Sequence, residues 1–160
     1  MCSSDLVFQG AEANISIQVR ETLTLGGLGI VGGISQIVGG TLKATGIISI
    51  EIGGGSADVS LTMNEASAIL TESATGEDEN AAHAITIRAD QDIRAAGTIQ
   101  ALQFGADITM TSGELLLIDG LVKANHRLTL TGGSDETGYG LLVEKMEFAV
   151  DAQGAQILDN

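Results

Sequence analysis

The sequence predicts an all-β fold, a right-handed parallel β-helix with about three short strands in each coil of roughly 20 or more residues. Apolar and polar residues alternate with a period of two along most of the chain, as in Ile15-Ser16-Ile17-Gln18-Val19, which is the pattern of a half-buried strand. Glycine supplies 22 of the 160 residues and interrupts most windows long enough to hold a helix, where each glycine would cost about 1 kcal/mol relative to alanine. A strand unit that recurs along the chain is the third observation that predicts this fold.

The recurring unit is an apolar, a polar and a small residue, followed by a β-branched strand. Such a unit cannot bury its apolar face alone and must stack on copies of itself, which builds a solenoid. The three clearest copies are Leu42-Lys43-Ala44 before Ile48-Ser49-Ile50, Ile99-Gln100-Ala101 before Ile108-Thr109-Met110, and Val122-Lys123-Ala124 before Leu128-Thr129-Leu130.

Residues 84–150 divide into three coils of three strands. Their leading threonines, Thr86, Thr109 and Thr129, are 23 and 20 residues apart, which is the length expected of one coil. Equivalent strands of successive coils then pair at about 4.8 Å, so that like side chains stack in ladders. The predicted strands are 85–89, 92–95 and 98–102, then 108–111, 115–118 and 121–124, and last 128–131, 141–143 and 146–150. The predicted inward positions are Ile85, Ile87, Ile108, Met110, Leu128 and Leu130.

The part before residue 75 shows the same strand pattern with less regular spacing, so its coil register stays open. The predicted strands there are 15–19, 22–25, 34–38, 41–44, 47–52, 58–62 and 68–71. Two stretches, 75–83 and 133–140, interrupt the pattern with charged and small residues and are predicted to be loops that leave the coil at corners. Other corners are expected at glycines, which suit a sharp bend or a positive φ. These glycines are Gly97, Gly113, Gly120, Gly132 and Gly133.

The first six residues, 1–6, are predicted to be a non-native artefact. The segment from Cys2 to Leu6 can be encoded by TGC TCT TCC GAT CT plus one base, which resembles the end of a sequencing adaptor. The remaining residues, 7–160, are expected to be a single β-solenoid segment of a larger protein, encoded by a gene fragment. The one cysteine of the chain lies in the artefact, so no disulfide framework is predicted.

The charge of the chain excludes two classes of partner. The formal net charge is −14, from 21 acidic and 7 basic residues, and the basic residues do not cluster. Such a surface repels phosphate backbones and anionic headgroups, so we expect neither nucleic-acid binding nor membrane binding through a basic patch. No run of about 18 apolar residues occurs, so membrane insertion is not expected either.

One repeat unit also carries a family resemblance. The unit Val122-Lys123-Ala124, followed after three residues by Leu128-Thr129-Leu130-Thr131-Gly132-Gly133, has counterparts at 42–50 and 99–113 and resembles the repeats of large secreted bacterial adhesins of the filamentous-haemagglutinin type. The resemblance covers residues 40–133. It implies a long β-helical shaft, exported to the bacterial surface, that displays binding regions away from the cell. The sequence lacks the amino-terminal secretion region of that family, so export is expected from the resemblance alone.

A glycine motif supports a different hypothesis. Gly27, Gly29 and Gly32 form G-x-G-x-x-G after a strand-like segment, and Glu51 follows about 20 residues later, where a dinucleotide-binding domain places its ribose-binding acid. That site requires a helix after the third glycine, with its N-terminus facing the pyrophosphate. The candidate helix, 33–45, is rich in glycine and β-branched residues, so dinucleotide binding through Gly27–Gly32 is kept only as a remote alternative.

Other candidates for metal binding or catalysis are weak. Gly53 to Asp58 matches part of a calcium-binding nonapeptide, but no tandem copy follows it. His83 and His126 have no further ligand at zinc-site spacing, and Ser35 does not lie in a G-x-S-x-G motif. The loop acids that could hold calcium loosely are Glu77, Asp78, Glu79, Asp135 and Glu136. We therefore expect no cofactor, no metal site and no catalytic residue.

The preferred hypothesis is a non-catalytic structural or adhesive segment of a large secreted or cell-surface bacterial exoprotein. Its expected partners are the neighbouring coils of the same parent chain and host or surface glycans or proteins. The main alternative is a carbohydrate-processing β-helix, a lyase or hydrolase, in which Asp90, Asp92 and Asp107 approach one another from adjacent coils. With one Tyr, three Phe and no Trp, the chain offers few of the aromatic platforms that a sugar-binding cleft normally uses.

Overall fold

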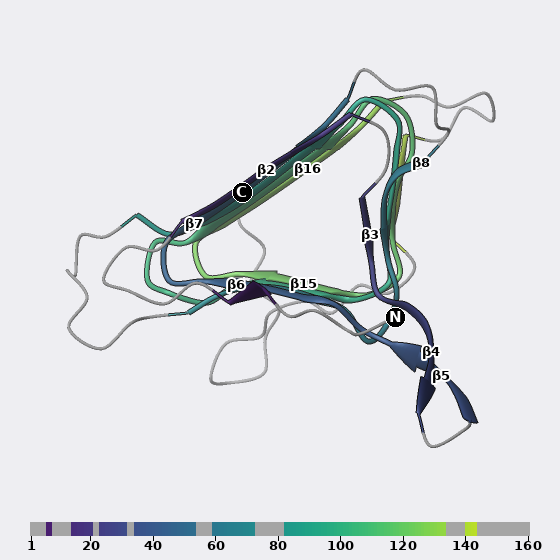
Figure 1. Ribbon diagram of the computed structural model, residues 1–160. Coiled ribbons are helices and arrows are strands. Elements are labelled where there is room, and N and C mark those ends of the chain that lie inside the picture. The colour runs from purple at the N-terminus through teal and green to yellow at the C-terminus, as the bar shows by residue number, and fades with distance from the viewer. Residues whose placement is uncertain are drawn as a thin grey trace, which may run out of the picture.

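The predicted all-β fold is confirmed by a computed structural model of the chain. In the described part the chain forms 17 strands and no helix. Fifteen of these strands form three parallel five-stranded sheets, and the view in Figure 1 shows the sheets as the three sides of a triangular coil. The arrangement is a parallel β-helix, in which each coil gives one strand to each side. The described residues are 6–7, 14–20, 23–31, 34–53, 59–72, 82–133 and 140–143.

The three sheets, here called A, B and C, are visited in that order by each of five coils. Sheet A consists of β1 (Leu6–Val7), β6 (Thr41–Ala44), β9 (Ala68–Thr71), β12 (Thr98–Ala101) and β15 (Leu121–Ala124). Sheet B consists of β2 (Ile15–Val19), β7 (Ile47–Ile52), β10 (Ala84–Ala89), β13 (Asp107–Ser112) and β16 (Arg127–Gly132). Sheet C consists of β3 (Leu23–Leu25), β8 (Val59–Met63), β11 (Asp92–Ala95), β14 (Leu116–Ile118) and β17 (Leu141–Val143).

The register of sheet B confirms the predicted ladder and extends it in the N-terminal direction. Thr86 pairs with Thr109, and Thr109 pairs with Thr129. Ser16 and Ser49 continue the same row through β2 and β7. The row therefore crosses all five coils, although its members are 33, 37, 23 and 20 residues apart in sequence. The two longer intervals contain insertions, and these insertions are the reason that the early register could not be found from spacing.

The core is a stack of aliphatic ladders with an exposed end. Ile48, Ile85 and Ile108 follow one another in the inward row of sheet B, and each is 0% exposed. Leu128 occupies the next place in that row but is 43% exposed, and Leu130 is only partly buried. Both leucines occupy the predicted inward rows, and they are more exposed than the preceding residues because β16 is the last strand of sheet B and no strand follows it among the described residues.

Residues 34–38 form a strand as predicted, but this strand lies outside the coil. Strand β5 (Ile34–Val38) pairs antiparallel with β4 (Gly27–Val31), and the two form a separate two-stranded sheet. In Figure 1 this hairpin projects from the corner between β3 and β6. A glycine pair between two apolar runs is a recognised hairpin signal, and the two residues between β4 and β5 are Gly32 and Gly33.

The corner glycines serve close packing between coils. Among the described glycines, only Gly26 and Gly105 have a positive φ, of 87° and 76°. A Cβ at Gly97 would collide with the carbonyl oxygen of Ser67, and a Cβ at Gly120 would collide with that of Gly97. Glycine is needed at these corners because the backbones of successive coils touch there. Of the two predicted reasons, the chain bends at Gly97 and Gly120, but neither has a positive φ.

Several sequence predictions fall on residues that the structure does not describe. They include the strand at 146–150 and most of the loops at 75–83 and 133–140. The strands predicted at 22–25 and 58–62 are found as β3 and β8, each shifted by one residue at its start. Leu6, the last residue of the predicted artefact, pairs with Leu42 in sheet A.

The position of a residue along the stack should set its contribution to stability. We expect Ile108→Ala to lower the free energy of unfolding by about 2–5 kcal/mol, because it opens a cavity in a coil that is covered on both sides. Leu128→Ala removes an apolar side chain of similar size from the same row at the exposed end, and should cost about half as much or less. Urea denaturation followed by circular dichroism measures both values. An equal decrease in the free energy of unfolding for the two variants would contradict the exposed end of the core at Leu128.

Candidate functional site

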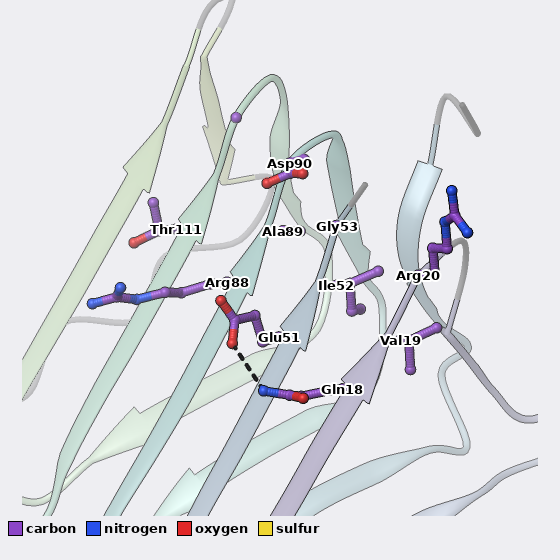
Figure 2. Close-up of a pocket in the computed structure, with 11 residues that line it drawn as sticks. Gln18, Val19, Arg20, Glu51, Ile52, Gly53, Arg88, Ala89, Asp90 and Thr111 are labelled. Carbon is purple, nitrogen blue, oxygen red and sulfur yellow. Dashed lines mark hydrogen bonds between the residues drawn. The ribbon is translucent and has the colours of Figure 1, made fainter. Parts of the chain in front are cut away.

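A groove of about 980 Å³ lies on the outer face of sheet B, near its corner with sheet C. Four successive strands, β2, β7, β10 and β13, supply or directly precede its lining (Figure 2). The lining residues are Gln18, Val19, Arg20, Glu51, Ile52, Gly53, Arg88, Ala89, Asp90, Thr111 and Gly113. Since equivalent positions of four coils contribute, the groove crosses the strands and follows the axis of the helix.

A row of four polar side chains forms one wall of the groove. Gln18 pairs in register with Glu51, Glu51 with Arg88, and Arg88 with Thr111. This row lies two residues beyond the hydroxyl row of Ser16 to Thr129, so its members share the outward face of the sheet. Neighbours in the row are about 4.8 Å apart at the backbone. The wall therefore presents an amide, a carboxylate, a guanidinium and a hydroxyl at regular intervals.

The next outward position along the strands is glycine in coils two and four, and Arg20 and Asp90 occupy it in coils one and three. Gly53, Asp90 and Gly113 follow one another at this position in coils two to four, as the hydrogen bonds from Asp90 N to Ile52 O and from Gly113 N to Ala89 O show. A Cβ at Gly53 would collide with the carboxylate of Asp90, and a Cβ at Gly113 would collide with the Asp90 carbonyl oxygen. The two glycines thus make room for Asp90, whose carboxylate lies close to Gly53 and adds a polar group to the groove.

The side chains of the groove supply both hydrogen-bond donors and acceptors. Gln18 Nε2 lies 3.5 Å from Glu51 Oε2, a separation at the outer limit of a hydrogen bond. Figure 2 shows the Arg88 guanidinium extending toward the side of its strand on which Thr111 lies, away from Glu51. Arg88 forms no ion pair with another residue in the described ranges. Its guanidinium is therefore available to a ligand in the groove.

The three aspartates predicted to approach one another have separate positions. Asp90 is exposed in the groove, whereas Asp92 is 8% exposed and lies beneath the corner. Asp92 Oδ1 accepts a hydrogen bond of 3.0 Å from Leu115 N, and Asp92 Oδ2 lies 3.0 Å from a guanidinium nitrogen of Arg94. Asp92 therefore joins two coils at the corner.

Asp107 lies at the opposite end of sheet B. It is aligned with Ala84, six residues before Asp90, which corresponds to about 20 Å along a strand. Its Oδ1 is 2.8 Å from His126 Nδ1, and both side chains are about half exposed. Asp107 is therefore too far from Asp90 to act with it. The carboxylate that does share the groove with Asp90 is Glu51, one strand away and two residues back, at about 8 Å between Cα atoms.

The glycine motif does not form the geometry that a dinucleotide site requires. Gly27 and Gly29 lie in strand β4, which pairs with β5 in a hairpin, and the described residues contain no helix to receive a pyrophosphate. Glu51 is exposed on the outer face of sheet B. Of the partial calcium motif, only Gly53 is described. Across the described ranges, no three His, Cys, Asp or Glu side chains gather as a metal site would need.

Comparison with known proteins adds no family. The chain matches no protein-family model, no curated protein and no solved structure. In the part of the chain that the structure describes, no helix has the length and apolar character required to cross a bilayer.

The sequence contained a partial signal for the groove. Counting two residues beyond Thr86 and Thr109 reaches Arg88 and Thr111, which are paired in the structure. The same count could not reach Gln18 and Glu51, because insertions before β7 and β10 hide their coil register. The sequence motifs point to Glu51 only as a ribose ligand, and none of them includes Arg88.

The buried carboxylate of Asp92 at the corner should contribute more to stability than an exposed carboxylate. We expect Asp92→Ala to lower the free energy of unfolding by about 1.5–3 kcal/mol, because the N–H of Leu115 and the Arg94 guanidinium lose a charged partner. Asp119→Ala, at an exposed position between β14 and β15, serves as the matched control and should change it by less than about 0.5 kcal/mol. Chemical denaturation measures both, and an Asp92 variant as stable as the control would contradict this role.

Proposed function

We propose that the chain is a rigid, non-catalytic structural and adhesive segment of a large secreted or cell-surface bacterial exoprotein. The observation that supports this best is the continuous parallel pairing of strands in all three sheets through five coils. In such a stack each coil contacts only its neighbours, so stiffness and length come from repetition. A stack of this kind suits a shaft that holds binding regions away from a cell.

The exposed end of the core also favours a shaft that continues. Ile108 and Leu116 are 0% exposed in the fourth coil, while Leu128 and Leu141, which follow them in the same inward rows, are each 43% exposed. A further coil would cover both leucines with the same ladder contacts that cover the residues before them. The neighbouring coils of a parent chain are therefore the first partners that we propose.

The charge of the surface fits an extracellular, repeated structure. A net charge of −14 on 160 residues keeps copies of the shaft apart and in solution. The same charge opposes contact with nucleic acid and with anionic lipid. Host or surface glycans and proteins remain the proposed external partners.

The carbohydrate-processing alternative now depends on a different pair of carboxylates. The groove contains Glu51 and Asp90, while Asp92 and Asp107 lie elsewhere. Cleavage of a polysaccharide that is abolished by Glu51→Gln or Asp90→Asn would favour the enzyme over the shaft.

Location provides the direct test of the proposed function. Antibodies raised against the folded chain should label intact cells of the organism that encodes it, or its culture medium, because an exoprotein is exposed outside the cell. Antibodies against a cytoplasmic protein of the same cells serve as the control and should label only permeabilised cells. Labelling by both antibodies only after permeabilisation would contradict the proposal.

A further inference from the structure

We propose that the groove on sheet B binds a neutral, extended oligosaccharide whose chain runs along the axis of the helix. The inference names a partner class for the adhesive role and rests on that proposed function. It is carried by the alignment of Gln18, Glu51, Arg88 and Thr111 in one row beside the Asp90 carboxylate.

The shape of the groove selects a linear ligand. Its lining comes from four successive coils, so it extends over three strand spacings, or about 14 Å. A polymer lying along the axis meets a polar side chain at each coil. A compact ligand would contact only one or two of them.

The available hydrogen-bonding groups favour a saccharide over a peptide. Strands β7, β10 and β13 are paired on both sides, so their backbone groups are used in the sheet. An extended peptide that binds by strand addition requires unpaired backbone groups at a sheet edge. The groove instead offers side-chain acceptors at Glu51 and Asp90, and side-chain donors at Arg88. Sugar hydroxyl groups both donate and accept, and can use both kinds.

The charge of the groove favours a neutral chain. Arg20 and Arg88 balance Glu51 and Asp90, so the charged side chains that line it sum to zero. The rest of the protein carries a strong negative charge, which repels polyanions at long range. A neutral ligand is not repelled in this way, and it leaves the charge balance of the groove unchanged.

No aromatic side chain lines the groove, so each coil should contribute little by itself. Binding strength should then grow with the number of coils that one ligand chain spans, because each added contact is intramolecular. We expect a hexasaccharide to bind at least about tenfold more tightly than the disaccharide of the same sugar.

The test is an amide chemical-shift titration of the full chain with cellohexaose and maltohexaose, with cellobiose, maltose and hexagalacturonate for comparison. Shifts should concentrate at 18–20, 51–53, 88–90 and 111–113. Glu51→Ala and Arg88→Ala should each weaken binding by about tenfold or more. The matched controls Glu65→Ala and Lys123→Ala, which remove an exposed acid and an exposed base elsewhere, should leave it unchanged.

The possible failures are distinct. If neither neutral hexasaccharide shifts the groove residues, or if hexagalacturonate binds more tightly than both, the groove proposal is overturned while surface labelling still tests the shaft. Equal weakening by the control variants also overturns it. If the hexasaccharide binds in the groove and is cleaved, the groove is supported and the non-catalytic function is overturned.

Discussion

The parallel register between successive coils is the constraint on which the rest of this structure depends. It forms the backbone hydrogen bonds of the three sheets, and it places aliphatic residues of one coil directly on those of the next. Ile48, Ile85 and Ile108 illustrate both effects, because they are paired in register and fully buried. With a core built of such thin layers, the chain needs no tryptophan and no proline, and aromatic residues form only 2% of it.

The same constraint explains why the chain tolerates insertions of very different length. Pairing joins equivalent strands, so the length of chain between them matters only for the entropy of closing the loop, which grows slowly with loop length. Coils two and three are 33 and 37 residues from their predecessors along the serine and threonine row, against 23 and 20 later. The β4–β5 hairpin occupies one of these insertions and leaves the register of sheets B and C intact.

The inward rows and the outward rows of the helix obey different rules. Inward positions must be aliphatic or small to fit the coil above and below, whereas outward positions are free to vary without altering the fold. The groove uses this freedom on the face of sheet B, where an amide, a carboxylate, a guanidinium and a hydroxyl are aligned. Gly53 and Gly113, at the adjacent position, allow the backbone and side chain of Asp90 to pass close to them. Any function of the chain therefore resides in residues that the fold does not require.

The period of two and the recurring unit were sufficient, by themselves, to determine the all-β class, the three-strand coil and the ladder from Thr86 through Thr109 to Thr129. Local alternation carries this information, because it states which side of each strand faces the core. Only the tertiary structure decided which early strands share a row, that residues 34–38 belong to a hairpin, and that Glu51 and Arg88 meet in a groove. These features depend on pairing between coils that are separated by insertions of unequal length. A local sequence pattern does not show how many residues lie between two paired strands.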